Sequence, residues 1–242
     1  MMEAGVYELQ VQGAGALALA EEPTIALLVA DEAGVQWWGP RLESALSGAR
    51  LGHGVRNALK VLIQPWSSVL PVVVRDIHVI GADTLPIDVL ARLESHGALL
   101  NLHHFDSSSD CSESMLWRSE SDLAAYLEKL FANLNGQAGF GMRWDDYALH
   151  LRQPGRRVGR HARGADWQTL LPVLLDSPEQ AWQASSVILF LDGGADLTLG
   201  HYVEVCNWLD SRLPARCLVT VSVLTGDGDP CSATLLLTTL QG

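Results

Sequence analysis

The side chains with the clearest binding chemistry in this sequence are arginines, because several of them lie in one stretch that holds few acids. The stretch from position 143 to position 163 holds only two acids, Asp145 and Asp146. Its six arginines are Arg143, Arg152, Arg156, Arg157, Arg160 and Arg163. A guanidinium can donate two parallel hydrogen bonds to a carboxylate, so such a segment can bind an acidic surface. Two interpretations are open: a contact with an acidic partner, or a solvated loop that offsets the acidity of the rest of the chain.

The run His103-His104-Phe105-Asp106, with Cys111 nearby, is the part of the sequence most typical of a metal site. Adjacent residues at a strand end point to opposite faces, so these histidines are not expected to share one ion. The serine-rich stretch 107–114 is either a phosphorylation site or a solvated connection. No Ser/His/Asp or Cys/His set has a supporting motif such as GxSxG. We therefore predict no metal site and no nucleophilic catalytic group.

The tryptophan pair Trp37-Trp38 offers a different kind of chemistry, a large apolar contact. Either both rings are structural, or one lies in the core and the other is exposed as an anchor for a partner.

Composition narrows the classes of protein to which the chain can belong. With 28 acids against 16 bases among 242 residues, its net charge is −12, which argues against a nucleic-acid binder because phosphates require clustered Lys and Arg. The four cysteines, Cys111, Cys206, Cys217 and Cys231, form no CxxC motif and no disulfide framework. The start lacks the basic region of a signal peptide, and no apolar run is long enough to span a membrane. We expect a cytoplasmic protein.

The elements that must position these residues fall into two patterns. In the first half, short apolar strands alternate with helices, which predicts a parallel, doubly wound sheet. The expected strands are 6–11, 25–29, 72–80 and 98–102, and the expected helices are 16–22, 55–69 and 87–96. The polar stretch 106–121 is expected to be a loop, and 122–134 an amphipathic helix.

In the second half, strands are expected at 187–191, 218–224 and 234–239 around a helix at 201–213, with the turn 225–230 joining the last two strands as a hairpin. A helix followed by an antiparallel pair is typical of an α+β module. We therefore divide the chain into 1–121, a connecting helix 122–139, and 140–242.

Three segments of the second half carry a family resemblance. Ser177-Pro178, the run Ser186-Val-Ile-Leu-Phe-Leu-Asp-Gly-Gly-Ala-Asp-Leu197, and Thr225-Gly226 after a further helix and strand resemble the C-terminal domain of FtsZ. FtsZ is the bacterial tubulin-family protein that builds the division ring. The resemblance covers about 100 residues by the order and spacing of elements. It implies a reduced FtsZ/tubulin-like α/β fold, with a Rossmann-like N-terminal domain, a connecting helix and an α+β C-terminal domain.

The N-terminal half resembles the same family in a degenerate form. Gln12-Gly13-Ala14-Gly15-Ala16-Leu17 stands where the family has Gly-Gly-Ala-Gly-Gly-Asn, and Leu51-Gly52-His53-Gly54 resembles its Leu-Gly-Ala-Gly turn. The resemblance implies that Gly13, Gly15, Gly52 and Gly54 are vestiges of a guanine-nucleotide site.

The glycine-rich tubulin signature is missing. After Val79-Ile80-Gly81-Ala82 the chain continues with Asp83-Thr84-Leu85-Pro86. Consecutive glycine N–H groups normally form the nest that holds the phosphates, and no P-loop replaces it.

The family's catalytic loop, Asn-x-Asp-Phe-x-Asp, is also altered. Gly141-Met142-Arg143-Trp144-Asp145-Asp146 stands in its place, so that only Asp146 keeps its acid and a guanidinium replaces the first. We therefore expect no enzyme and no cofactor, but a structural protein that self-associates or docks on authentic FtsZ, with Arg143, Asp145, Asp146, Arg156, Arg157, Arg160 and Arg163 as contact residues. Two alternatives are a divergent GTPase that binds GTP through the four glycines, and a small-molecule binder at the carboxyl ends of the strands.

Overall fold

The computed structural model of the protein describes residues 7–10, 24–47, 59–71, 73–105, 114–135, 141–193, 197–224 and 231–240. Gly13, Gly15, Gly52 and Gly54 lie outside these ranges, as do Cys111, the expected helix 16–22, the turn 225–230 and most of the serine-rich stretch.

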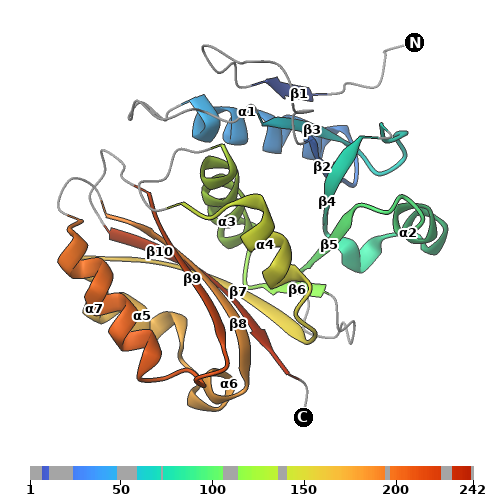
Figure 1. Ribbon diagram of the computed structural model, residues 1–242. Helices are drawn as coiled ribbons and strands as arrows, with labels where there is room; N and C mark the ends of the chain where they lie inside the picture. Colours follow the sequence, from blue (N-terminus) through green and yellow to red (C-terminus); the bar gives the residue numbers. More distant parts are fainter. Residues whose placement is uncertain are drawn as a thin grey trace.

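One sheet of ten strands runs through the described part of the chain (Figure 1). The strands are β1 (Tyr7–Gln10), β2 (Thr24–Val29), β3 (Lys60–Pro65), β4 (Val74–Ile80), β5 (Leu99–His104), β6 (Ser114–Trp117), β7 (Arg156–Gly164), β8 (Ala184–Asp192), β9 (Leu218–Leu224) and β10 (Cys231–Thr239). Their order across the sheet is β1-β3-β2-β4-β5-β6-β7-β10-β8-β9. From β3 to β7 every pair is parallel, β10 is antiparallel to both β7 and β8, and β9 is parallel to β8.

Helices cover both faces of this sheet. They are α1 (Glu32–Ser47), α2 (Ile87–Glu94), α3 (Glu120–Leu134), α4 (Trp144–Leu151), α5 (Trp167–Leu174), α6 (Pro178–Trp182) and α7 (Leu199–Asp210), and a short 3-10 helix, η1 (Ala82–Thr84), follows β4. On one face α1, α3 and α4 pack on a core that includes Ile25, Ile188 and Phe190. On the other face α2 covers the first half of the sheet and α5, α6 and α7 cover the second half. The expected mixed α/β architecture is confirmed.

The connecting helix α3 packs on the middle of the sheet through most of its surface. Eleven of its fifteen residues are buried, and Ser119 caps its start by accepting a hydrogen bond from Asp122 N at 3.2 Å. Beneath it the sheet continues without a break from β6 to β7. The domain boundaries at residues 121 and 139 therefore stay a prediction from the sequence.

Three expectations about the first half of the chain are wrong. Lys60–Pro65, expected within a helix, is the parallel strand β3, in which five of six residues are buried. Ser114–Trp117, expected within a loop, is the strand β6, whose Met115 and Trp117 point into the core. The first strand, expected in the parallel sheet, is β1, which pairs antiparallel with β3 at the outer edge. The first strand along the chain with parallel neighbours on both sides is the completely buried β2.

The expected hairpin of the last two strands is also wrong. β9 pairs with β8, whereas β10 inserts between β7 and β8. The burial of the two strands explains this outcome: seven consecutive residues of β10 are buried, as a central strand requires, but only two of the seven in β9 are.

Candidate functional site

The carboxyl edge of the parallel strands is where an open α/β sheet binds ligands, at the point where the strand order reverses. Here that point lies after β2, because β3 lies on one side of it and β4 on the other. β1 ends at Gln10 opposite Lys60, the first residue of β3, and therefore at the other edge of the sheet. The turn that follows β2, Ala30-Asp31, is the one that leads into α1 at this edge.

Acidic side chains surround this turn. Asp31 accepts a hydrogen bond from Gly34 N at 3.0 Å, which caps the start of α1, and Glu32 is the first residue of the helix. A Cβ at Gly34 would lie 2.9 Å from Val29 Cβ, so the helix start packs closely on the end of β2. After β4, Asp83 accepts hydrogen bonds from His104 Nδ1 at 2.8 Å and from Phe105 N at 3.2 Å. Of these three carboxylates, those of Asp31 and Asp83 therefore already bind groups of the protein itself.

The start of α4 holds the residues that correspond to the altered catalytic loop. Asp146 accepts a hydrogen bond from Arg143 N at 3.1 Å, and its Oδ2 atom lies 3.5 Å from the exposed guanidinium of Arg143. Met142, just before, is buried, and its N–H donates to Asn133 Oδ1 at the end of α3. Arg143 and Asp145 project into solvent, whereas Asp146 is half-buried and serves as the cap of its own helix.

The arginine-rich segment is not a loop. Arg156–Gly164 is the strand β7, with β6 on one side and β10 on the other. Both interpretations of this segment assumed a loop, and the structure corrects that assumption. Pairing on both edges fixes alternate side chains on opposite faces, so neighbouring arginines of β7 have different surroundings.

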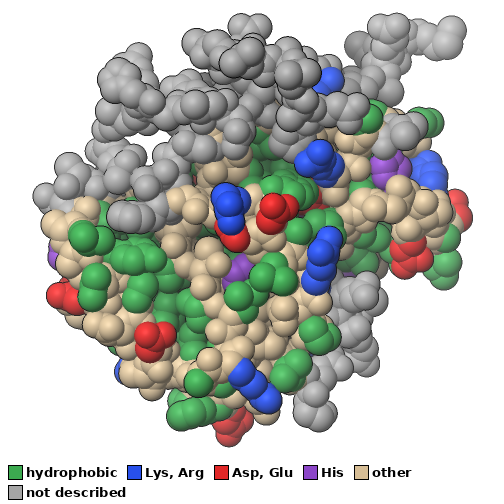
Figure 2. Space-filling view, viewed as in Figure 1, with side chains coloured by type: hydrophobic (Ala, Val, Ile, Leu, Met, Phe, Trp, Pro, Cys, Tyr) green, Lys and Arg blue, Asp and Glu red, His purple; other side chains and the backbone are tan. Residues whose placement is uncertain are grey.

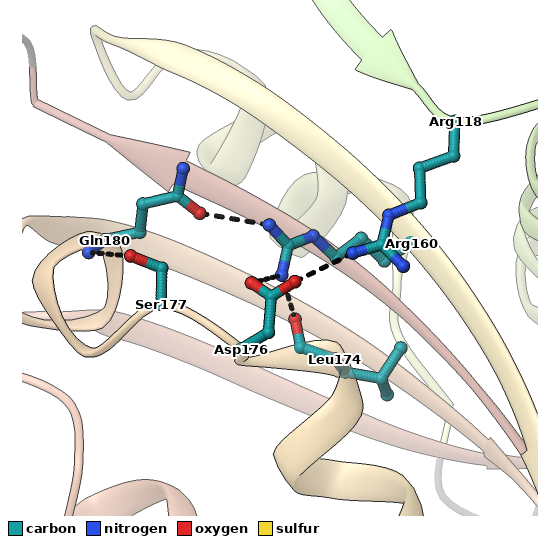
Figure 3. A network of polar contacts seen from close by, with 6 residues as sticks. All are labelled: Arg118, Arg160, Leu174, Asp176, Ser177 and Gln180. Atoms are coloured by element: carbon teal, nitrogen blue, oxygen red, sulfur yellow. Dashed lines mark hydrogen bonds and ion pairs between the residues drawn. The ribbon is translucent and has the colours of Figure 1, made fainter.

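Arg160 is buried and joins three segments (Figure 3). Its guanidinium donates to Leu174 O at 3.0 Å and to Gln180 Oε1 at 3.1 Å, and it forms an ion pair with Asp176. Arg118, which follows β6, donates to the other carboxylate oxygen of Asp176 at 2.8 Å. The network thus ties the end of α5 and the helix α6 to the middle of the sheet.

Arg157 is likewise turned inward, where its guanidinium donates to Leu151 O and to Gln153 O at the end of α4. Arg156 is half-buried, and Arg163 is exposed. Of the seven predicted contact residues, the structure leaves Arg143, Asp145 and Arg163 exposed, and it buries Arg157 and Arg160 in internal contacts.

A buried chain of hydrogen bonds under α3 was not predicted. Trp117 Nε1 donates to His103 Nδ1 at 2.9 Å, His103 Nε2 lies 2.9 Å from His78 Nδ1, and His78 Nε2 lies 2.9 Å from Asp76 Oδ2. Asn101 donates to the other oxygen of Asp76. Because the indole can only donate, His103 must accept on Nδ1 and donate from Nε2, and His78 must then donate to the carboxylate.

Burial lowers the pKa of His103 well below its usual range, and the neighbouring His78 and His104 add to the effect. The sequence does contain a signal for this network: polar residues stand at alternate positions of two apolar strands, Asp76 with His78 and Asn101 with His103.

His103 and His104 turn to different partners, as expected from strand geometry. In the described ranges, no group of three or more His, Cys, Asp or Glu side chains is placed to hold a metal ion.

Lys129 of α3 makes a second buried polar contact. Its ammonium donates to Ser232 Oγ at 2.7 Å and lies 3.4 Å from Asp192 Oδ2, so it links α3 to β8 and β10. Burial lowers its pKa, and the Asp192 carboxylate partly offsets the shift.

A hollow of about 700 Å³ lies at the opposite, amino edge of the sheet. Its lining includes Ala98 just before β5, Gly155 just before β7, and Leu240 just after β10. It is therefore remote from the carboxyl edge at which a small-molecule site was expected as one alternative.

The tryptophan pair divides between core and surface. Trp38 is buried in the core under α1, whereas Trp37 is 42% exposed, with the Arg41 guanidinium 5.0 Å above its ring. One ring therefore lies in the core and one is exposed, while a role of Trp37 as an anchor for a partner stays a prediction. Among the described helices, none is both long and apolar enough to cross a membrane.

Solved structures of FtsZ resemble this fold. An empty FtsZ dimer from M. jannaschii matches with a TM-score of 0.55 and 13% identity, over 70% of this chain and 64% of that one. A W319Y mutant of FtsZ from M. jannaschii matches with a TM-score of 0.60 and 11% identity, over 90% of this chain and 91% of that one. No protein-family model and no curated protein matches the sequence. The likeness is therefore one of fold.

Proposed function

We propose that this protein is a non-catalytic, FtsZ-like structural protein that self-associates or docks on authentic FtsZ, in cell division or a related cytoskeletal role, without binding GTP. Two observations support the cytoskeletal part of the proposal. The fold is similar to FtsZ over 90% of the chain, and one of the similar structures is described as a dimer.

The observation that carries the proposal is the acidic carboxyl edge beside β2. A helix N-terminus attracts phosphate because its first N–H groups are unpaired and its dipole is positive there. In this chain the Asp31 carboxylate already accepts from Gly34 N, and Glu32 adds a second negative charge in the same turn. A triphosphate would have to displace one carboxylate and approach another, which opposes binding electrostatically.

The start of α4 supports the non-catalytic part. A carboxylate that positions water for GTP hydrolysis must be free to accept a proton or to hold the water. Asp146 is bound to the N–H and guanidinium of Arg143. A guanidinium stays protonated, so Arg143 cannot take over the role of a base.

The exposed residues define the proposed contact surface. It consists of the exposed Arg143 and Asp145 and the half-buried Asp146 at the start of α4. Arg163 near the end of β7 is also exposed, whereas Arg156 is half-buried at the other end of that strand. Arg157 and Arg160 are not available to a partner, because the end of α4 and the Asp176 turn already bind them.

Co-sedimentation with FtsZ of the same organism, polymerised by GTP, tests this proposal. We expect the wild-type protein to pellet with FtsZ filaments, or by itself without nucleotide, and Arg143→Glu to reduce the pelleted fraction several-fold. Arg152→Glu is the matched control, since Arg152 is exposed at the other end of the same helix and should leave pelleting unchanged. Wild-type protein that stays in the supernatant under both conditions, or an equal loss in both variants, would contradict the proposal.

A further inference from the structure

In the part of the chain that the structure describes, no strand covers the outer edge of β9, which is the last strand of the sheet. Natural sheets protect such edges with charged side chains, proline, a bulge or a very short strand. β9 has seven residues, Leu218-Val-Thr-Val-Ser-Val-Leu224, with no charge and no proline, and its register with β8 is regular throughout.

The two faces of β9 are covered, so that only its edge remains. Val219 and Val221 pack on one side against the core beneath α7, which includes Val205 and Leu209. On the other side Thr220 Oγ1 lies 2.8 Å from His150 Nε2 of α4, and Ser222 donates a hydrogen bond to Asn133 of α3. In Figure 1 the strand accordingly runs between α7 and α4.

The sequence of β9 is complementary to itself in the antiparallel direction. A twofold axis through Val221 would place Leu218 opposite Leu224 and Val219 opposite Val223 of a second copy. It would place Thr220 opposite Ser222, whose hydroxyls already bind His150 and Asn133 within each copy, and Val221 opposite itself. Each cross-strand pair would therefore match in type, and no like charges would meet.

We propose that the β9 edges of two copies pair antiparallel about Val221 and join their sheets into one closed dimer. Twofold contacts of this kind use the same patch on both subunits and need no further subunit. The inference therefore goes beyond the assembly proposed above, and it concerns a different surface from the start of α4.

Exposed apolar side chains on α7 and α4, the helices that pack on β9, support a second copy of this chain as the partner. Leu199 and Val203 of α7 are 63% and 49% exposed, and Leu149 of α4 is 47% exposed. Figure 2 shows apolar side chains gathered over α7 on the face that is viewed. A strand pair alone buries little surface, and these side chains, on the two helices that pack on the faces of β9, are the exposed apolar surface with which a dimer could enlarge the contact.

Two double variants that differ in the sign of one charge test the pairing. Leu218 and Leu224 are half-buried, and neither belongs to the hydrophobic cores, so both tolerate substitution. Leu218→Lys with Leu224→Lys places lysines opposite each other twice, whereas Leu218→Lys with Leu224→Glu places opposite charges there. Sedimentation velocity between about 1 and 100 µM should show twice the 26.2 kDa chain mass for the wild type and the Lys/Glu variant, and a monomer for the Lys/Lys variant.

Cysteine cross-linking tests the register. Val221→Cys should form an intermolecular disulfide on mild oxidation, because directly opposite Cβ atoms lie about 5 Å apart. Val219→Cys is the matched control, since its own copy would lie four residues away, at about 14 Å. The wild-type chain, oxidised in the same way, is the control for any cross-link that the native cysteines form.

A wild-type monomer at every concentration would overturn the inference, as would equal cross-linking of Val219→Cys and Val221→Cys. Larger assemblies that both double variants leave unchanged would overturn it as well, and they would leave intact the proposal that the protein self-associates or docks on FtsZ through another surface.

Discussion

At the scale of single residues, His103 has a role in the core that the sequence did not predict. His103 was considered as a metal ligand, and the structure makes it the middle of a hydrogen-bond chain from Trp117 to Asp76. The opposite orientation of His103 and His104 could be predicted from strand geometry alone. The hydrogen-bond partners of His103 could not be predicted, because Asp76 and His78 are 25 or more residues away in sequence. They come close to His103 only through the pairing of β4 with β5.

Acid sensitivity is a prediction at this scale. Burial lowers the pKa of His150 and of His161 to about 4, and that of His103 well below its usual range. The unfolded chain binds protons at these histidines near pH 6.5, and the folded chain does so only at lower pH. The unfolded state therefore binds more protons below pH 6.5, and the stability present above that pH is lost as the pH falls.

Calorimetry at pH 7.5 and pH 5 measures this effect as a fall in the melting temperature. The variant His150→Gln removes one of the three groups and should make the fall smaller. A melting temperature that is the same at both pH values, or higher at pH 5, would contradict the assignment of these histidines as buried and neutral.

At the scale of elements, periodicity predicted the strands and helices that are apolar on one face or throughout. Strands β2, β4, β5, β8 and β9 and helices α2, α3 and α7 lie where they were expected, within a few residues. The local sequence pattern did not predict the strands that form because distant segments pair with them. β7 has five arginine or histidine side chains among its nine residues, Arg156, Arg157, Arg160, His161 and Arg163, and it is a strand because β6 and β10 pair with it.

The burial of Arg160 gives a prediction for this element. Arg160→Met removes the donor for Leu174 O and Gln180 and leaves Asp176 with Arg118 alone, so the free energy of unfolding should fall by about 2–3 kcal/mol. Arg163→Met is the matched control, because Arg163 lies on the same strand and is exposed. Its expected effect is within about 0.5 kcal/mol. Urea denaturation of both variants measures the difference, and equal effects would show that the Arg160 network adds no stability.

At the scale of the whole molecule, the family resemblance predicted the FtsZ-like α/β architecture, and the comparisons confirm that fold. The candidate site was predicted less well. The glycine turn was assigned to the stretch after the first strand, but β1 is an antiparallel edge strand, and the strand order reverses after β2. Strand order depends on contacts between distant segments, so the sequence alone could not place the acidic turn Ala30-Asp31 at the carboxyl edge where the strand order reverses.

The central claim is that this FtsZ-like fold works without GTP, and a titration with fluorescent GTP in the presence of Mg²⁺ tests it most directly. Authentic FtsZ under the same conditions serves as the positive control. We predict no saturable binding up to about 1 mM protein, which corresponds to less than about 4 kcal/mol of binding free energy. Saturable binding at micromolar concentrations, competed by unlabelled GTP, would contradict the account and favour a divergent GTPase.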